Sequence, residues 1–121
     1  MSWELTNDRP IFQQLTEDLL LKIVKGEYPV GSRLEGVRDL AVSAGVNPNT
    51  MQRALTELEK SGILFVKRGD GRYITNDQQK IENLKEQYIR EKTRDFIASL
   101  EILGLRKPEI EKAVEAVLEE R

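Results

Sequence analysis

The sequence of 121 residues contains neither cysteine nor histidine, and only 6% of its residues are aromatic. It can therefore form no disulfide, it lacks the usual zinc ligands, and it has neither a thiol nor an imidazole to act as an enzyme's nucleophile or general base. Its longest apolar run, between Leu19 and Val24, is broken by Lys22 and is too short to span a membrane. We expect a cytoplasmic protein that is not an enzyme and uses no metal or cofactor.

An excess of positive charge is also missing. The net charge is −2 and the pI is about 5.3, which argues against a protein that coats nucleic acid without selectivity. The charge is uneven along the chain, because residues 1–30 and 76–121 each carry −2. Residues 31–75, with seven cationic and five anionic side chains, carry +2. Only this middle segment has the sign that suits an anionic partner.

The middle segment contains a pattern of two short helices joined by a tight turn, between Val37 and Gly62. Gly45 stands where the chain must turn sharply, and glycine adopts positive φ without steric cost. Asn47 and Pro48 follow as a helix cap and a first helical residue. Apolar residues then recur at helical spacing and form an inner face: Met51, Ala54, Leu55 and Leu58. This order predicts a helix-turn-helix.

The outer face of the second helix carries amides, hydroxyls and one arginine where surface helices usually carry glutamate and lysine. Its residues are Asn49, Thr50, Gln52, Arg53 and Thr56. In the major groove of DNA, arginine suits guanine, and asparagine or glutamine suits adenine. The face therefore predicts base recognition; the alternative is a solvated polar face without a partner.

A two-stranded hairpin is predicted directly after this helix. Its apolar strand positions, on either side of a turn at residues 68–71, are Ile63, Phe65, Tyr73 and Ile74. The cations beside the turn, Lys67, Arg68 and Arg72, suit phosphates or a minor groove. A helix-turn-helix followed by such a wing is a winged helix-turn-helix. Taken alone, the hairpin could equally be an ordinary one with charged ends.

Further helices are predicted on both sides of this segment. One begins at Pro10, a long one follows the wing, and a last one begins at Pro108. We expect a mainly α fold with a small β wing. An N-terminal winged helix-turn-helix domain would occupy residues 1–75, and a C-terminal helical hairpin would occupy residues 76–121.

The C-terminal hairpin has an apolar face that it cannot bury by itself, and such faces bind a partner. We expect a second copy of the chain to cover it, so that the protein is a homodimer; packing on its own N-terminal domain is the alternative. The candidate interface residues are Leu84, Tyr88, Phe96, Leu100, Val114 and Val117. A small-molecule effector between aromatic side chains such as Trp3 and Tyr88 is possible, but the sequence does not indicate one.

The chain resembles the DNA-binding domain of the GntR family of bacterial transcriptional regulators over residues 10–75. The resemblance lies in three stretches: PIFQQLTEDLLLKIVKGEYPVGSRL, VRDLAVSAGVNPNTMQRALTELEKSG and RGDGRYI. The C-terminal stretch LGLRKPEIEKAV is similar to the YtrA-like subgroup, which has a short two-helix dimerisation region. The resemblance implies a homodimer that binds a palindromic operator in double-stranded DNA, usually as a repressor.

By motif position, the resemblance places DNA contacts at the start of the first helix of the helix-turn-helix, on its recognition helix and in the wing. These are Arg38, Asn47, Asn49, Thr50, Gln52, Arg53, Arg68 and Gly71, to which the cation Arg72 is added. The chain differs from the family at Glu35 and Gly36, where Pro-Ser is usual, and at Asp70, an anion in the wing tip. Arg38 could instead form a surface ion pair with Asp39 or Glu35.

A protein-interaction module without specific DNA binding is the alternative function, because winged helices can also dock other proteins. Such a module would need apolar anchors on the outer face around Arg53, and the sequence has none there.

Overall fold

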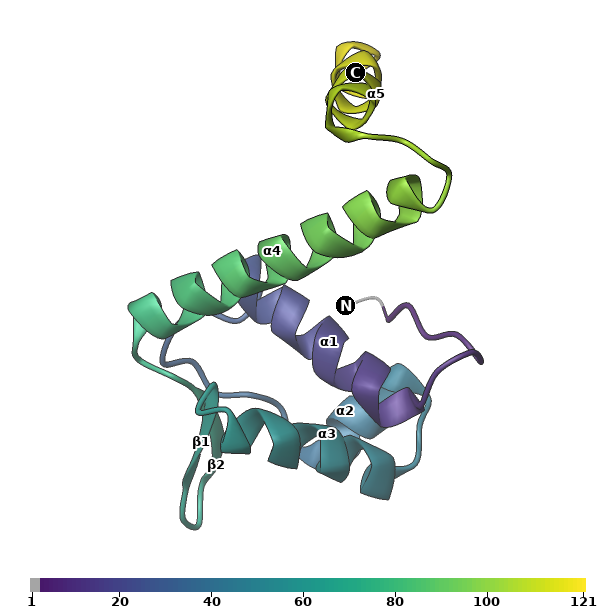
Figure 1. Ribbon diagram of the computed structural model, residues 1–121. Helices are drawn as coiled ribbons and strands as arrows, with labels where there is room; N and C mark the ends of the chain where they lie inside the picture. The colour runs from purple at the N-terminus through teal and green to yellow at the C-terminus, as the bar shows by residue number, and fades with distance from the viewer. Residues whose placement is uncertain (1–2) are drawn as a thin grey trace. The chain divides into compact units, whose positions relative to one another are not determined.

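The computed structural model describes residues 3–121, which form five helices and a two-stranded sheet (Figure 1). In chain order the elements are α1 (Ile11–Val24), α2 (Val37–Ala44), α3 (Pro48–Lys60), β1 (Leu64–Lys67), β2 (Gly71–Ile74), α4 (Gln78–Glu101) and α5 (Lys107–Glu119). They group into two compact units, Met1–Leu84 and Lys85–Arg121. The predicted fold class, a winged helix-turn-helix followed by two C-terminal helices, is confirmed.

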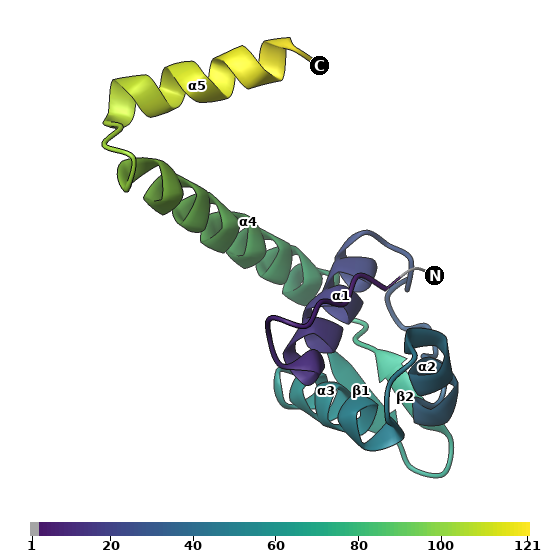
Figure 2. The same cartoon turned by 90° about the vertical axis from the view of Figure 1, so that its right-hand side faces the viewer.

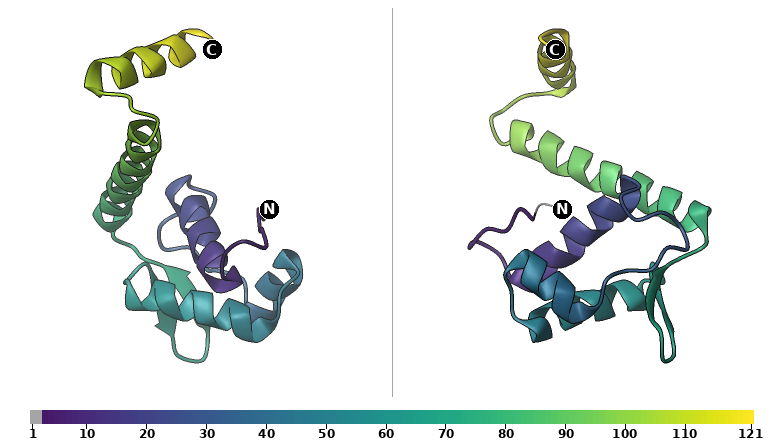
Figure 3. Two further views of the ribbon diagram at one scale, coloured as in Figure 1. Left: turned by 45° about the vertical axis from the view of Figure 1, so that its right-hand side comes forward. Right: turned by 180° about the vertical axis from the view of Figure 1, so that it is seen from behind.

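Three helices form the core of the first unit (Figures 1 and 3). α1 and α2 both pack against α3, because α3 turns its predicted apolar face inward. Leu15 and Leu19 of α1, Leu40 of α2, and Met51 and Leu55 of α3 are at most 1% exposed. This packing leaves the opposite, polar face of α3 in solvent.

The turn between α2 and α3 has the local structure that its sequence predicts. Gly45 ends α2 in the left-handed conformation, with φ of 70°. Asn47 Oδ1 accepts a hydrogen bond from the backbone N–H of Asn49 at 2.8 Å, and Pro48 begins the helix. α2 has no side-chain cap, because Gly36 occupies its N-cap position. The helix-turn-helix is thus set by residues within a few positions of one another.

The wing is an antiparallel pair of β1 and β2 that extends away from the end of α3 (Figure 3). Lys67 pairs with Gly71, so the turn consists of residues 68–70 and is one residue shorter than predicted. Arg33 adds a single β-bridge to Tyr73, so the segment before α2 also pairs with the wing. The wing is therefore attached to the rest of the unit at its base.

The segment before α1 is held against the helices by side-chain contacts. The indole N–H of Trp3 donates to Ser43 Oγ of α2 at 3.0 Å, and Lys22 Nζ lies 4.4 Å from the centroid of the indole ring. The buried amide of Gln14 accepts from the backbone N–H of Thr6 at 2.7 Å and donates to the carbonyl of Thr6 at 2.9 Å. Trp3 packs against the core of the first unit in this way.

α4 begins in the first unit and continues into the second. Asp77 Oδ1 caps it by accepting from the backbone N–H of Gln79 at 3.0 Å. Ile81 is 4% exposed in the first core and Leu84 packs against that core, which is why the first compact unit extends to Leu84. A functional division between residues 75 and 76 stays a prediction.

The second unit contains the rest of α4 and the whole of α5, which runs at an angle to the end of α4 (Figure 2). Gly104, with φ of 90°, lies in the turn that joins them. Between residues 85 and 121 no side chain is buried. Throughout residues 3–121, none of the helices combines the length and the apolar character needed to cross a membrane.

Candidate nucleic-acid interface

The outer face of α3 presents several of the predicted contact residues to solvent. Asn49, Gln52 and Arg53 are exposed, and Thr50 is half-buried. Arg38, in the first turn of α2, is exposed as well, and it makes no ion pair within residues 3–121. The surface ion pair considered for Arg38 is therefore not formed. Both helices thus present polar side chains to solvent.

Local contacts already restrain the side chains of Asn47, the N-cap of α3, and of Gln52 within it. The side-chain oxygen of Asn47 is used as the helix cap, so its NH₂ group is the part left for a partner. Gln52 Nε2 lies 3.5 Å from Thr56 Oγ1, and that hydroxyl donates to the carbonyl of Gln52 at 2.9 Å. These contacts restrict the side chains before any partner binds, which lowers the entropic cost of binding.

Arg53 lies against α1. Its guanidinium carbon is 3.6 Å from the ring centroid of Phe12, a stacked cation–π contact. No pattern in the sequence connects Phe12 with Arg53. The contact depends on how α1 crosses α3, which no local pattern in the sequence reveals.

The wing tip is organised around Asp70. Its carboxylate accepts hydrogen bonds from Tyr73 Oη at 2.6 Å and from Arg33 Nε at 3.2 Å, and Arg33 Nη2 donates to the backbone carbonyl of Asp70 at 2.7 Å. The hydrogen bond from Tyr73, followed by that from Arg33, lowers the pKa of Asp70 below its usual value. The anion in the wing tip therefore orders the turn, a role that the sequence did not assign to Arg33.

Gly71 suits this arrangement. Its φ is 155°, and a Cβ atom at this position would lie 3.0 Å from Arg33 Nη2. A side chain would meet both the unusual backbone conformation and the guanidinium. The structure thus gives Gly71 a role in the geometry of the wing, and the DNA contact predicted for it stays a prediction.

Arg72 is directed at α3 instead of the solvent. Its guanidinium pairs with the carboxylate of Glu59, and the two side chains are only 19% and 27% exposed. The exposed cations of the wing are Arg68, in the turn, and Lys67, whose Nζ lies 4.2 Å from the centroid of the Tyr73 ring. Arg72 ties the wing to α3, and the contact with DNA predicted for it stays a prediction.

The predicted dimer residues lie in both units. Leu84 packs against the first core, whereas Tyr88, Leu100 and Val114 are half-buried. Phe96 is 46% exposed and Val117 is 52% exposed. An open apolar cleft of about 360 Å³ lies between α4 and α5, lined by Phe96, Leu100, Ala113, Val114, Val117, Leu118 and Arg121. Large apolar side chains at the surface of a helix pair are typical of a protein interface.

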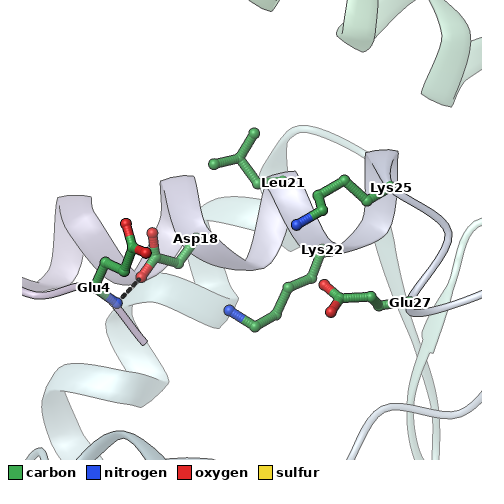
Figure 4. A pocket seen from close by; sticks show the side chains of 6 residues that line it. All are labelled: Glu4, Asp18, Leu21, Lys22, Lys25 and Glu27. Carbon is green, nitrogen blue, oxygen red and sulfur yellow. Dashed lines mark hydrogen bonds between the residues drawn. The ribbon is translucent and has the colours of Figure 1, made fainter. Parts of the chain in front are cut away.

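A hollow of about 140 Å³ on the first unit is polar and of mixed charge (Figure 4). It is lined by Glu4, Asp18, Leu21, Lys22, Lys25 and Glu27. The backbone N–H of Glu4 donates to Asp18 Oδ2 at 3.1 Å across its edge. Carboxylates at both ends make it unsuitable for a nucleic-acid backbone. Within residues 3–121 no cluster of acidic side chains is arranged to hold a metal ion.

The architecture has known relatives. The family model described as "Bacterial regulatory proteins, gntR family" matches residues 11–74, which run from α1 to β2. The HTH-type transcriptional regulator YhcF of Bacillus subtilis is 31% identical over 119 residues, 98% of each chain. The HTH-type transcriptional repressor YtrA of Bacillus subtilis is 33% identical over 111 residues, which cover 91% of this chain and 83% of YtrA.

A solved structure agrees with these matches over nearly the whole chain. A GntR family transcriptional regulator from Listeria monocytogenes is similar with a TM-score of 0.88 and 37% identity, covering 93% of this chain and 98% of that chain. The likeness therefore includes the two C-terminal helices as well as the winged helix-turn-helix. The chain belongs to the GntR family, within its YtrA-like subgroup, and is a DNA-binding transcriptional regulator and not an enzyme.

Proposed function

We propose that the protein acts as a homodimer that binds a palindromic operator and represses transcription. The observation that carries the proposal is the outer face of α3, where Asn49, Gln52 and Arg53 are exposed. These side chains have the donors and acceptors that match base edges in the major groove. The tethered wing with Arg68 in its turn is suited to the backbone or the minor groove beside it.

Base recognition by α3 is tested with single substitutions. We expect Arg53→Ala and Gln52→Ala each to weaken binding to the selected operator by about 1–3 kcal/mol, because each removes a contact to a base. Arg90→Ala, which removes an exposed cation of α4, is the matched control and should leave affinity nearly unchanged. The measurement is a gel-shift titration with DNA selected from a random pool. Unchanged affinity in both α3 variants would refute the assignment.

The same selection separates the proposal from the alternative function. A homodimer should select two half-sites in inverted orientation, because the two recognition helices are then related by a two-fold axis. A protein-interaction module should select no sequence at all. The half-site spacing read from the selected pool would also give the separation of the two α3 helices.

The second unit supports the dimer, since residues 85–121 bury no side chain of their own and form an open apolar cleft. We expect Val117→Asp to make the protein monomeric, because a carboxylate at the interface would lose its water. Lys112→Asp, on an exposed polar position of α5, is the control and should remain dimeric. Sedimentation equilibrium measures both. A dimeric Val117→Asp variant would exclude this position from the interface.

Repression is proposed because YtrA of Bacillus subtilis, similar over 91% of this chain, is a transcriptional repressor. A repressor at its operator blocks transcription when bound, so deleting the protein should raise expression from a reporter behind the selected operator. A fall in expression upon deletion would instead identify an activator.

A further inference from the structure

Arg53 of α3 stacks on the ring of Phe12 of α1. The guanidinium carbon of Arg53 lies 3.6 Å from the centroid of the Phe12 ring, well inside the range of about 6 Å over which cation–π pairs are attractive. Phe12 is the second residue of α1 and is half-buried, whereas Arg53 is exposed. The ring thus covers one face of a cation that is otherwise in solvent.

The polar edge of Arg53 has no other partner within residues 3–121. The carboxylates beside it in the groove between α1 and α3 belong to Glu17 and Glu57. Glu17 is paired with Arg9 at 2.9 Å and Glu57 with Lys60 at 3.6 Å. Arg53 makes no ion pair or hydrogen bond with a described residue, so its N–H groups remain available while its face is held.

We propose that Phe12 is a positioning residue for base recognition: its ring holds the guanidinium of Arg53 in the orientation that reads one guanine of each half-site. This inference rests on the proposed role of Arg53 in binding DNA. A guanidinium that reads guanine must present two parallel N–H groups to O6 and N7. An arginine side chain has many rotamers in solvent, and a stack on an aromatic face restricts them without using any N–H group. Through this contact α1 contributes to sequence specificity, although none of its own side chains contacts a base.

The proposal predicts how substitutions at Phe12 depend on Arg53. We expect Phe12→Leu to weaken operator binding about two- to fivefold, the range that corresponds to an exposed cation–π contact. Phe12→Tyr keeps the ring and should restore the affinity of the original chain. Binding to a DNA with the affected G·C pair replaced should be insensitive to Phe12→Leu. In the Arg53→Ala background, Phe12→Leu should have no further effect.

The same titrations contain the results that would overturn the proposal. An equal loss from Phe12→Leu with and without Arg53 would mean that Phe12 acts on the packing of α1 alone. Tighter binding by Phe12→Leu would mean that the ring withholds Arg53 from DNA. Thermal unfolding of each variant distinguishes a loss of folding from a loss of positioning. Phe12→Tyr, which keeps the ring, is the matched control for both measurements. An Arg53→Ala variant with full operator affinity refutes the proposed base contact as well, whereas a weakened Arg53→Ala beside an unaffected Phe12→Leu refutes only the positioning role.

Discussion

The pair between Arg72 and Glu59 should stabilise the fold more than an ordinary surface ion pair. Its side chains are 19% and 27% exposed, and it joins β2 to α3. Exposed pairs contribute about 0–1 kcal/mol, and removing one partner of a fully buried pair costs about 3–5 kcal/mol. With about a quarter of each side chain in solvent, we expect a coupling free energy of about 1–2 kcal/mol.

The coupling is measured with a double-mutant cycle of Arg72→Met and Glu59→Gln, from urea unfolding at one protein concentration. Fixed concentration is needed because dimerisation adds to the apparent stability. The matched control is the bidentate pair of Arg9 and Glu17, whose side chains are 47% and 44% exposed. Its coupling should be smaller than that of the Arg72–Glu59 pair and should fall further in 1 M salt, where the Debye length is about 3 Å. Equal coupling in the two cycles would refute the reasoning.

The same variants report on the role of Arg72 at the operator. If Arg72 acts by holding the wing against α3, Glu59→Gln and Arg72→Met should weaken operator binding to a similar degree. A loss confined to Arg72→Met would show instead that its guanidinium contacts DNA, as the resemblance to the family implies. The comparison therefore separates the structural role from the predicted contact.

Three further outcomes are expected. Leu55→Ala should lower the free energy of unfolding by about 2–5 kcal/mol in urea titrations, because Leu55 is 0% exposed in the core; a smaller loss would contradict this packing. Asn47→Ala should cost about 1 kcal/mol in the same assay through loss of the α3 cap, whereas Asn49→Ala should not. Burial of Tyr28, and then its hydrogen bond to Glu35 at 2.8 Å, raise the pKa of the phenol. The contribution of the protonated phenol to the free energy of unfolding is fully present below about pH 10 and is lost as the pH rises above it. In Tyr28→Phe, the free energy of unfolding should therefore fall less steeply at alkaline pH.

Helix boundaries were predictable where a single residue type dictates the backbone. Gly45 needs no neighbour to adopt a φ of 70°, and Asn47 caps the residue two positions ahead of it. The turn of the wing was predicted one residue too long, because glycine was taken as a turn residue at position 71. In the structure Gly71 pairs with Lys67, and its φ of 155° favours a glycine at this position.

The candidate site was predictable as a set of exposed residues and not as a set of contacts. Periodicity alone separates the inner face of α3 from the polar face that carries Gln52 and Arg53. It does not show which cations are already engaged. Arg72 and Arg68 look equivalent in the sequence, yet Arg72 pairs with Glu59 and Arg68 is exposed.

By itself, the sequence determined the order of elements, the helix caps, the inward face of α3 and the family, because these depend on residues close together in the chain. Only the tertiary structure decided that Phe12 supports Arg53 and that Asp70 is held by Arg33 and Tyr73. Such contacts join separate elements and depend on the angle and distance at which those elements pack. A local pattern records that each residue is polar or apolar, and packing decides which partner it finds.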